Sequence, residues 1–150
     1  MQTTELSDVL KKTYLMGGLS AEQVDKVAGI CQSRFFEGGD VLVRQFSKDT
    51  DLILILEGTA RINSFSGELI AEAGPGSIIG EMSLVDDKPR SATVLSVGRT
   101  KAAVIPAQEL WKLMREDAHL ARIILLNIAR VLSARLRAAN IQLDLGVHHR

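Results

Sequence analysis

Short apolar stretches separated by glycines fill the middle of the sequence, over residues 33–105. The clearest stretches are residues 41–43, 52–56 and 92–97, with single or paired glycines or Gly-Pro-Gly between them. Short strands at such spacing, separated by turn residues, are typical of antiparallel barrels and jelly rolls. We therefore expect residues 32–106 to form an antiparallel β jelly-roll barrel and the fold to be mainly β with flanking helices.

Both ends of the sequence have the apolar spacing of helices instead. Residues 4–15 and 20–30 are expected to form two short helices, separated by a Gly-Gly pair. Ser20, with glutamate and glutamine in the turn that follows, is typical of a capped helix start. After the barrel we expect a short helix over residues 107–115 and a long C-terminal helix over residues 117–143.

Length and composition indicate one globular domain. The 150 residues include 46% hydrophobic side chains, which is enough to fill one core. Eighteen basic and eighteen acidic side chains cancel, which argues against binding of nucleic acid through bulk charge. Apolar runs are too short to span a membrane and the first residues lack a secretion signal, so we expect a cytoplasmic protein. The predicted single domain, 1–150, consists of N-terminal helices (1–31), the barrel (32–106) and C-terminal helices (107–145).

Leucines and alanines recur along the long helix at alternating steps of four and three, as in a coiled coil. This seam consists of Leu125, Ala129, Leu132, Leu136, Ala139 and Leu143. It predicts a homodimer through the C-terminal helix, although packing of the helix on its own barrel explains the seam equally well. Ile124, Ile128 and Val131 form a second apolar stripe, so the helix can make both contacts.

Glycines, an acidic residue and an arginine follow one another within residues 76–94, the segment called the cassette below. The glycines permit close approach of the backbone to a ligand, and one helical turn over residues 80–85 would direct free N–H groups at an anion. Arg90 could bind two phosphate oxygens with its planar guanidinium, while ionised Glu81 could accept hydrogen bonds from ribose hydroxyls. The cassette thus predicts a binding site for a sugar phosphate.

The cassette resembles that of cyclic nucleotide-binding domains, a family that includes catabolite-activator-type regulators, protein kinase A regulatory subunits and cyclic nucleotide-gated channels. The family cassette begins with Gly-Glu and continues through apolar and small residues to an arginine, a small residue and Ala-Thr-Val. The matching residues are Gly80, Glu81, Arg90 and Ser91 to Val94, and further resemblance lies in residues 13–20, 39–45 and 54–58. The resemblance implies a regulatory module that binds a cyclic nucleotide, and not an enzyme.

The resemblance also implies a role for individual residues. Glu81 would bind the ribose 2′-hydroxyl and Arg90 the cyclic phosphate. The family usually covers the base with a residue of its last helix, and position alone nominates Arg135 for this, with Leu132 or Leu136 as neighbours. Backbone or hydroxyl contacts to phosphate are expected around Gly80, Ser91 and Ala92, and contacts to sugar and base from Ile62, Ile70 and Met82. The full set expected to bind the ligand is Gly80, Glu81, Met82, Ser83, Arg90, Ser91, Ala92, Ile62, Ile70 and Arg135.

One segment departs from the family pattern. The family often has a glycine and acidic residues between its second and third strands, whereas this chain has Phe46-Ser-Lys-Asp-Thr-Asp51. We expect this loop to lie away from the cassette. Ser91, directly after the cassette arginine, is compatible with cyclic AMP or cyclic GMP, and of the two we expect cyclic AMP.

Other functions fit the sequence less well. A ligand-free barrel that serves as a protein interaction or dimerisation domain is the alternative, and the presence of both Glu81 and Arg90 argues against it. A jelly-roll metalloenzyme would need several histidines on its strands, and none lies within residues 1–118. His148 and His149 could not close a metal site alone, so we expect no metal. Only a handful of residues follow the long helix, fewer than a DNA-reading motif requires, so we expect no direct reading of DNA unless the sequence is a fragment. The effector protein is not evident from the sequence.

Overall fold

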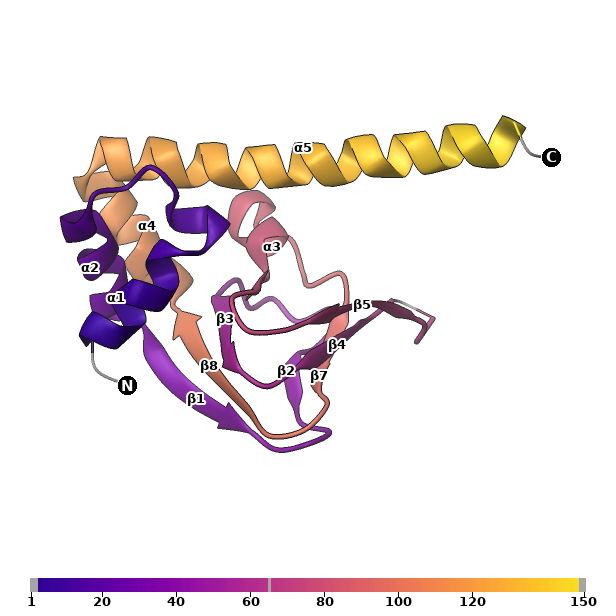
Figure 1. Cartoon of the computed structure of the whole chain (residues 1–150), viewed down its shortest axis with the longest axis horizontal. Coiled ribbons are helices and arrows are strands. Elements are labelled where there is room, and N and C mark those ends of the chain that lie inside the picture. Colours follow the sequence, from indigo (N-terminus) through magenta and orange to yellow (C-terminus); the bar gives the residue numbers. More distant parts are fainter. Residues whose placement is uncertain (1–2, 65, 149–150) are drawn as a thin grey trace.

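The computed structural model describes the backbone of residues 3–64 and 66–148 and the side chains of residues 4–64 and 66–141. Within these residues, two four-stranded antiparallel sheets have the strand orders β1-β8-β3-β6 and β2-β7-β4-β5 (Figure 1). The strands are β1 (Gln32–Phe36), β2 (Val41–Val43), β3 (Leu52–Glu57), β4 (Ala60–Asn63), β5 (Leu69–Ala73), β6 (Ile78–Ile79), β7 (Thr93–Ser96) and β8 (Thr100–Ile105). The predicted fold, an antiparallel β structure with helices at both ends, is confirmed.

The apolar run of β3 is continuous because both of its faces are buried. Leu52 and Leu54 belong to a hydrophobic cluster shared with the helices, whereas Ile53 and Ile55 belong to a second cluster inside the barrel. Successive side chains of a strand point to opposite faces, so one strand supplies residues to both cores. β3 therefore joins the barrel to the helical layer.

The N-terminal region consists of helix α1 (Thr3–Lys11), a 3₁₀ turn (Tyr14–Met16) and helix α2 (Ala21–Ile30). The predicted helix over residues 4–15 is thus too long. Thr13 adopts an extended backbone and its hydroxyl donates to the carbonyl oxygen of Leu10, which ends the helix. The chain after Thr13 can then turn inward, where Leu15 and Met16 are buried. At α2 the expected capping residues form a complete capping box between Ser20 and Gln23.

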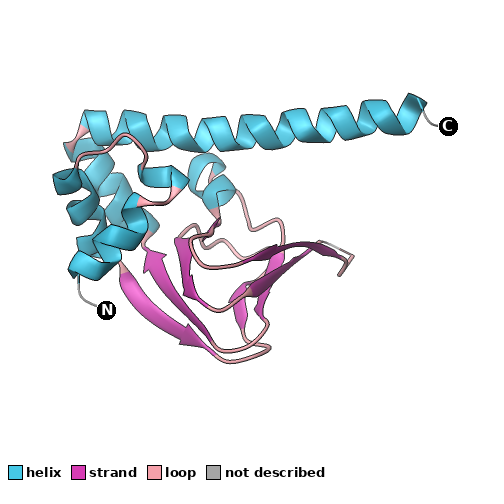
Figure 2. Cartoon of the chain, in the orientation of Figure 1, coloured by secondary structure: helices cyan, strands magenta, loops and turns pink. Residues whose placement is uncertain are grey.

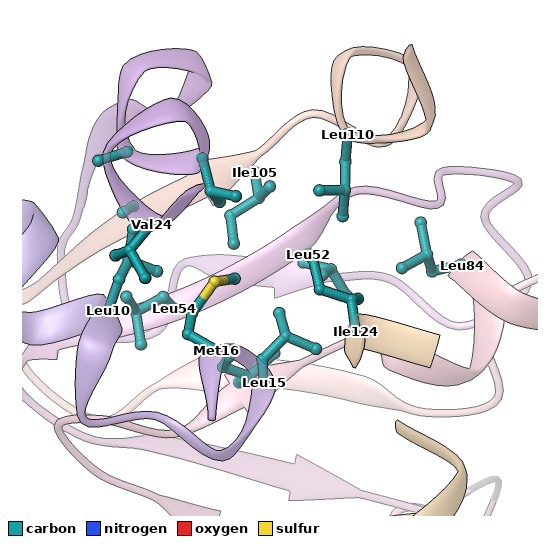
Figure 3. Close-up of a cluster of buried hydrophobic side chains, with 14 of the residues drawn as sticks. Leu10, Leu15, Met16, Val24, Leu52, Leu54, Leu84, Ile105, Leu110 and Ile124 are labelled. Atoms are coloured by element: carbon teal, nitrogen blue, oxygen red, sulfur yellow. The ribbon is translucent and has the colours of Figure 1, made fainter. Parts of the chain in front are cut away.

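The helices α4 (Ala107–Glu116) and α5 (Ala118–His148) follow the barrel. The first turns of α5 pack on the domain through Ile124 and Ile128, which are fully buried in the helical core. Figure 3 shows Ile124 in this core together with Leu10 and Met16. Asn127 holds this part in place, because its amide donates to the carbonyl oxygens of Leu15 and Gly17. Farther along, α5 extends past the barrel (Figures 1 and 2).

The seam on α5 does not behave as one uniform surface. Leu125 and Leu132 pack partly against the core of their own domain, whereas Ala129, Leu136 and Ala139 are exposed. The side chain of Leu143 lies outside the described residues. The expected packing of the second stripe on the domain holds for Ile124 and Ile128, and Val131 is half-buried.

Candidate functional site

A cavity of about 450 Å³ lies between the barrel and α5, beside the short helix α3 (Glu81–Asp86). All ten residues that the sequence nominated line it: Gly80, Glu81, Met82, Ser83, Arg90, Ser91, Ala92, Ile62, Ile70 and Arg135. Strand residues that the sequence did not nominate complete the lining: Val43, Ala71, Ile78, Ile79 and Val94. A volume of this size is typical of pockets for small-molecule ligands.

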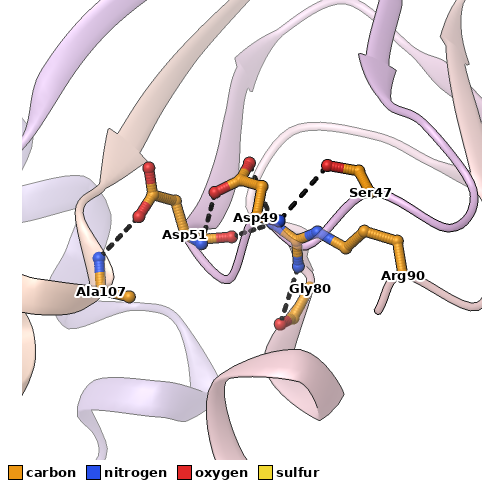
Figure 4. A network of polar contacts seen from close by, with 6 residues as sticks. All are labelled: Ser47, Asp49, Asp51, Gly80, Arg90 and Ala107. Atoms are coloured by element: carbon orange, nitrogen blue, oxygen red, sulfur yellow. Dashed lines mark hydrogen bonds and ion pairs between the residues drawn. The ribbon is translucent and has the colours of Figure 1, made fainter. Parts of the chain in front are cut away.

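Arg90 is the buried cation of this cavity, with only 3% of the residue exposed. Its Nη1 donates to the carbonyl oxygen of Gly80 at 3.2 Å, and its Nη2 donates to the carbonyl oxygen of Asp51 (Figure 4). The Asp49 carboxylate lies 3.4 Å from Nη2. Nε of Arg90 is buried and has no hydrogen-bond partner among the described residues. The guanidinium therefore keeps one donor with which it could bind an anion.

The loop over residues 46–51 contacts the cassette directly, so the expectation that it lies away from the cassette is wrong. The backbone N–H of Phe46 donates to the carbonyl oxygen of Arg90 at 2.9 Å. The backbone N–H of Arg90 in turn donates to the carbonyl oxygen of Ser47 at 2.8 Å. These paired backbone bonds bring Asp49 and Asp51 to the guanidinium. The acidic residues of this loop are visible in the sequence. Their position beside Arg90 is not, because hydrogen bonds between backbone groups leave no sequence pattern.

Gly80 must be a glycine for two reasons. Its φ of 98° lies in the left-handed region, which residues with a Cβ rarely adopt. A Cβ at this position would collide with Nη1 of Arg90 and come within 3.0 Å of the carbonyl oxygen of Asp51. The close approach of the backbone to Arg90 therefore depends on this residue.

Glu81 lies at the start of α3 and is almost fully buried. Its Oε1 accepts a hydrogen bond from Nη1 of Arg135, which comes from α5 and is 57% exposed. The pKa of the nearby Tyr14 hydroxyl is raised to about 12, first by burial and then by the charge of Glu81, while the charge of Arg135 lowers it. The Tyr14 hydroxyl is itself buried without a hydrogen-bond partner in the described part of the chain. One buried carboxylate thus links the cassette, α5 and the N-terminal 3₁₀ turn.

The apolar part of the cavity combines buried and exposed side chains. Ile70 and Met82 are 60% and 49% exposed, although both line the cavity, and Ile62 is half-buried. Large exposed apolar side chains around a cavity with a few convergent polar groups are typical of a binding site. The sequence missed Val43 and Val94 because they read equally well as ordinary core positions.

The geometry agrees with the comparison with known proteins. A family model described as a cyclic nucleotide-binding domain matches residues 33–117. The chain belongs to this family. The cyclic nucleotide-binding domain here is 35% identical over 144 residues to the cyclic AMP receptor protein of Thermus thermophilus, covering 91% of this chain and 63% of that protein. The solved cyclic nucleotide-binding domain from Methylobacillus flagellatus is 28% identical with a TM-score of 0.79, covering 93% of this chain and 81% of that one.

Similar domains also occur within longer proteins of other kinds. Glutaminase 1 of Bradyrhizobium diazoefficiens is 26% identical over 144 residues, covering 96% of this chain but 23% of the enzyme. The chain therefore spans less than two thirds of the curated relatives named here. Within the described residues, no group of three or more histidine, cysteine, aspartate or glutamate side chains could hold a metal ion. None of the described helices is both long enough and apolar enough to cross a membrane.

Proposed function

We propose that the cavity binds cyclic AMP and that the domain is a regulatory module without catalytic activity of its own. The observation that carries this proposal is the spare Nε donor of buried Arg90 on a cavity that also contains a buried carboxylate. An unpaired buried donor is costly in a folded protein, and an anionic phosphate oxygen would satisfy it. Arg90 would therefore bind the cyclic phosphate.

Glu81 would bind the other polar part of the ligand. An ionised carboxylate is an acceptor only, so it fits the hydroxyl of a ribose and repels a second phosphate. Ser91 and Ala92 follow Arg90 in the chain and line the same cavity, and they would contact the phosphate. Ile62, Ile70 and Met82 would pack against sugar and base, and Arg135 would lie over the base.

The bond between Arg135 and Glu81 supports coupling of ligand binding to movement of α5. A ribose hydroxyl that donates to Glu81 changes the environment of the carboxylate that Arg135 contacts. Beyond Leu132, which packs partly on the core, the described part of α5 is mostly exposed, so this part of the helix can respond to that change. A ligand shifts such an equilibrium by its difference in affinity for the two positions of the helix.

Thermal unfolding tests the binding proposal. Cyclic AMP at about 100 times its dissociation constant should add roughly 2.7 kcal/mol to the free energy of unfolding. Cyclic GMP tests the choice of base, and linear 5′-AMP, which has the same base without the cyclic phosphate, is the control. If neither cyclic nucleotide raises the melting temperature of ligand-free protein at millimolar concentration, the cavity has another ligand or none.

We further propose a parallel homodimer through the exposed part of α5. Leu136 of the seam is 62% exposed, and Ala129 and Ala139 of the same seam are exposed too, on a helix that extends past its own barrel. Leu136→Asp should make the protein monomeric, because a carboxylate is costly to bury in the seam. Ala134→Asp, two residues away on the opposite side of the same helix, should leave the dimer intact. Light scattering that finds the native protein monomeric at high micromolar concentration would exclude this dimer.

A further inference from the structure

Asp51 makes hydrogen bonds in two directions, to the cassette and to the start of α4. Its carbonyl oxygen accepts from Nη2 of Arg90, and its side-chain Oδ1 accepts from the backbone N–H of Ala107 at 2.7 Å (Figure 4). Both partners are buried, Arg90 at 3% and Ala107 at 4% exposed. One half-buried aspartate therefore joins the buried cation of the cavity to the first residue of a helix.

α4 needs this contact because it lacks a cap of its own. The first N–H groups of a helix have no partner within the helix, and the residue before it usually supplies a side-chain acceptor. At α4 that residue is Pro106, which makes no side-chain cap bond. Asp51, the loop residue directly before β3, takes the place of the missing cap, although it lies 56 residues earlier in the chain.

Asp49 fixes the geometry of this connection. Its Oδ1 accepts from the backbone N–H of Asp51 at 3.1 Å, and its Oδ2 lies 3.4 Å from Nη2 of Arg90. The guanidinium of Arg90 is thus held by the side chain of Asp49 and by the backbone carbonyl oxygen of Asp51. Movement of Arg90 cannot leave Asp51 unaffected.

α4 passes the effect on to α5. Its buried residues Leu110 and Met114 share the helical core with Ile124 of α5. We propose that Asp51 is a positioning residue that ties Arg90 to the first turn of α4, so that an anion on Arg90 protects this turn. This connection is separate from the bond between Arg135 and Glu81, and it rests on the proposed function only for the identity of the anion.

Amide hydrogen exchange of the full chain, resolved by NMR, tests the connection without ligand. Asp51→Ala should lower the protection of the Ala107 amide by about fivefold, the usual effect of a lost cap. Asp51→Asn, which keeps an acceptor oxygen, should restore most of it. Arg90→Ala should also lower the protection of the Ala107 amide. In a protein that already carries Asp51→Ala, Arg90→Ala should lower it no further.

The α2 cap provides the matched control. Ser20→Ala removes the acceptor of the Gln23 N–H at the start of another helix, and neither residue is bonded to Arg90 or Asp51 in the described part of the chain. It should lower protection at α2 and leave the response of α4 to Arg90→Ala unchanged. A global loss of stability would lower amide protection in α2 and α4 alike. The ratio of the protection at the start of α4 to that at the start of α2 therefore isolates the connection between Arg90 and α4.

Addition of cyclic AMP separates this inference from the proposed function. In the native protein the ligand should raise protection of the α4 first turn, and in Asp51→Ala it should bind without doing so. Failure of cyclic AMP to bind contradicts the proposed function alone, because the variants without ligand still decide the connection. The inference is wrong if Arg90→Ala lowers the protection of the Ala107 amide equally in the native and Asp51→Ala proteins, or does not lower it at all. In either case Asp51 does not connect Arg90 to α4.

Discussion

The two charged residues of the cavity, Arg90 and Glu81, are held in different ways. Arg90 is fixed by carbonyl oxygens of Gly80 and Asp51, which belong to the barrel and its loops. Glu81 is held by Arg135, a largely exposed side chain of a helix that extends past the barrel. We therefore expect Arg90 to contribute most of the affinity for the ligand, and Glu81 with Arg135 to transmit ligand binding to α5.

Loss of the fixed end should have the largest effect. Arg90→Ala removes charged hydrogen bonds worth about 1.5 to 3 kcal/mol each, so the dissociation constant for cyclic AMP should rise at least about tenfold. Calorimetric titration measures it. Arg61→Ala is the control, since Arg61 has the same charge, lies on β4 and forms an exposed ion pair with Glu72. Equal losses in the two variants would show that Arg90 acts only through net charge.

Glu81→Gln should have the second largest effect. A neutral amide accepts a weaker hydrogen bond than a carboxylate, so affinity should fall by about tenfold. The 2′-deoxy analogue should bind the native protein weakly but lose little further affinity for Glu81→Gln, because hydroxyl and carboxylate form one interaction. Losses that simply add would mean that Glu81 does not contact the 2′-hydroxyl.

The sequence could predict many of the residues that line the cavity but not the contacts that hold Arg90 and Glu81. Residues 80–92 are contiguous, so their place on one cavity follows from local order, and the glycine and apolar pattern gave the barrel around them. The contacts of Arg90 with Asp51 run through backbone carbonyls, which every residue has. Arg135 was nominated for the base by position alone, and its bond to Glu81 depends on how α5 crosses the barrel. Such long-range contacts have no local signature.

Arg135→Gln should separate affinity from response. The exposed arginine contributes little to binding, so the dissociation constant should change only by about threefold. The ligand-dependent change in amide exchange along α5 should disappear, because the link to Glu81 is lost. Arg137→Gln, on the same exposed part of the helix, should leave both properties unchanged. A normal α5 response in Arg135→Gln would place the coupling elsewhere, with Asp51 the first candidate.

The smallest expected effect is on Tyr14, the only tyrosine of the sequence and therefore a specific reporter of the Glu81 end. Its pKa is raised to about 12 by burial first and then by Glu81, while Arg135 lowers it. Glu81→Gln should therefore lower the Tyr14 pKa and Arg135→Gln should raise it, each by less than about one unit. Tyrosinate absorbance during alkaline titration measures this shift, with circular dichroism to show that the fold persists.

The same titration fixes the sign of the effect on stability. Because the folded pKa lies above the ordinary value of 10.0, the contribution of Tyr14 to the free energy of unfolding is complete below pH 10 and is lost as pH rises towards about 12. Cys31, whose pKa burial also raises to about 12, adds to this loss but not to the absorbance. Identical Tyr14 midpoints in the native protein and both variants would show that Arg135 and Glu81 do not meet beside it, and the contrast between the two ends would fail.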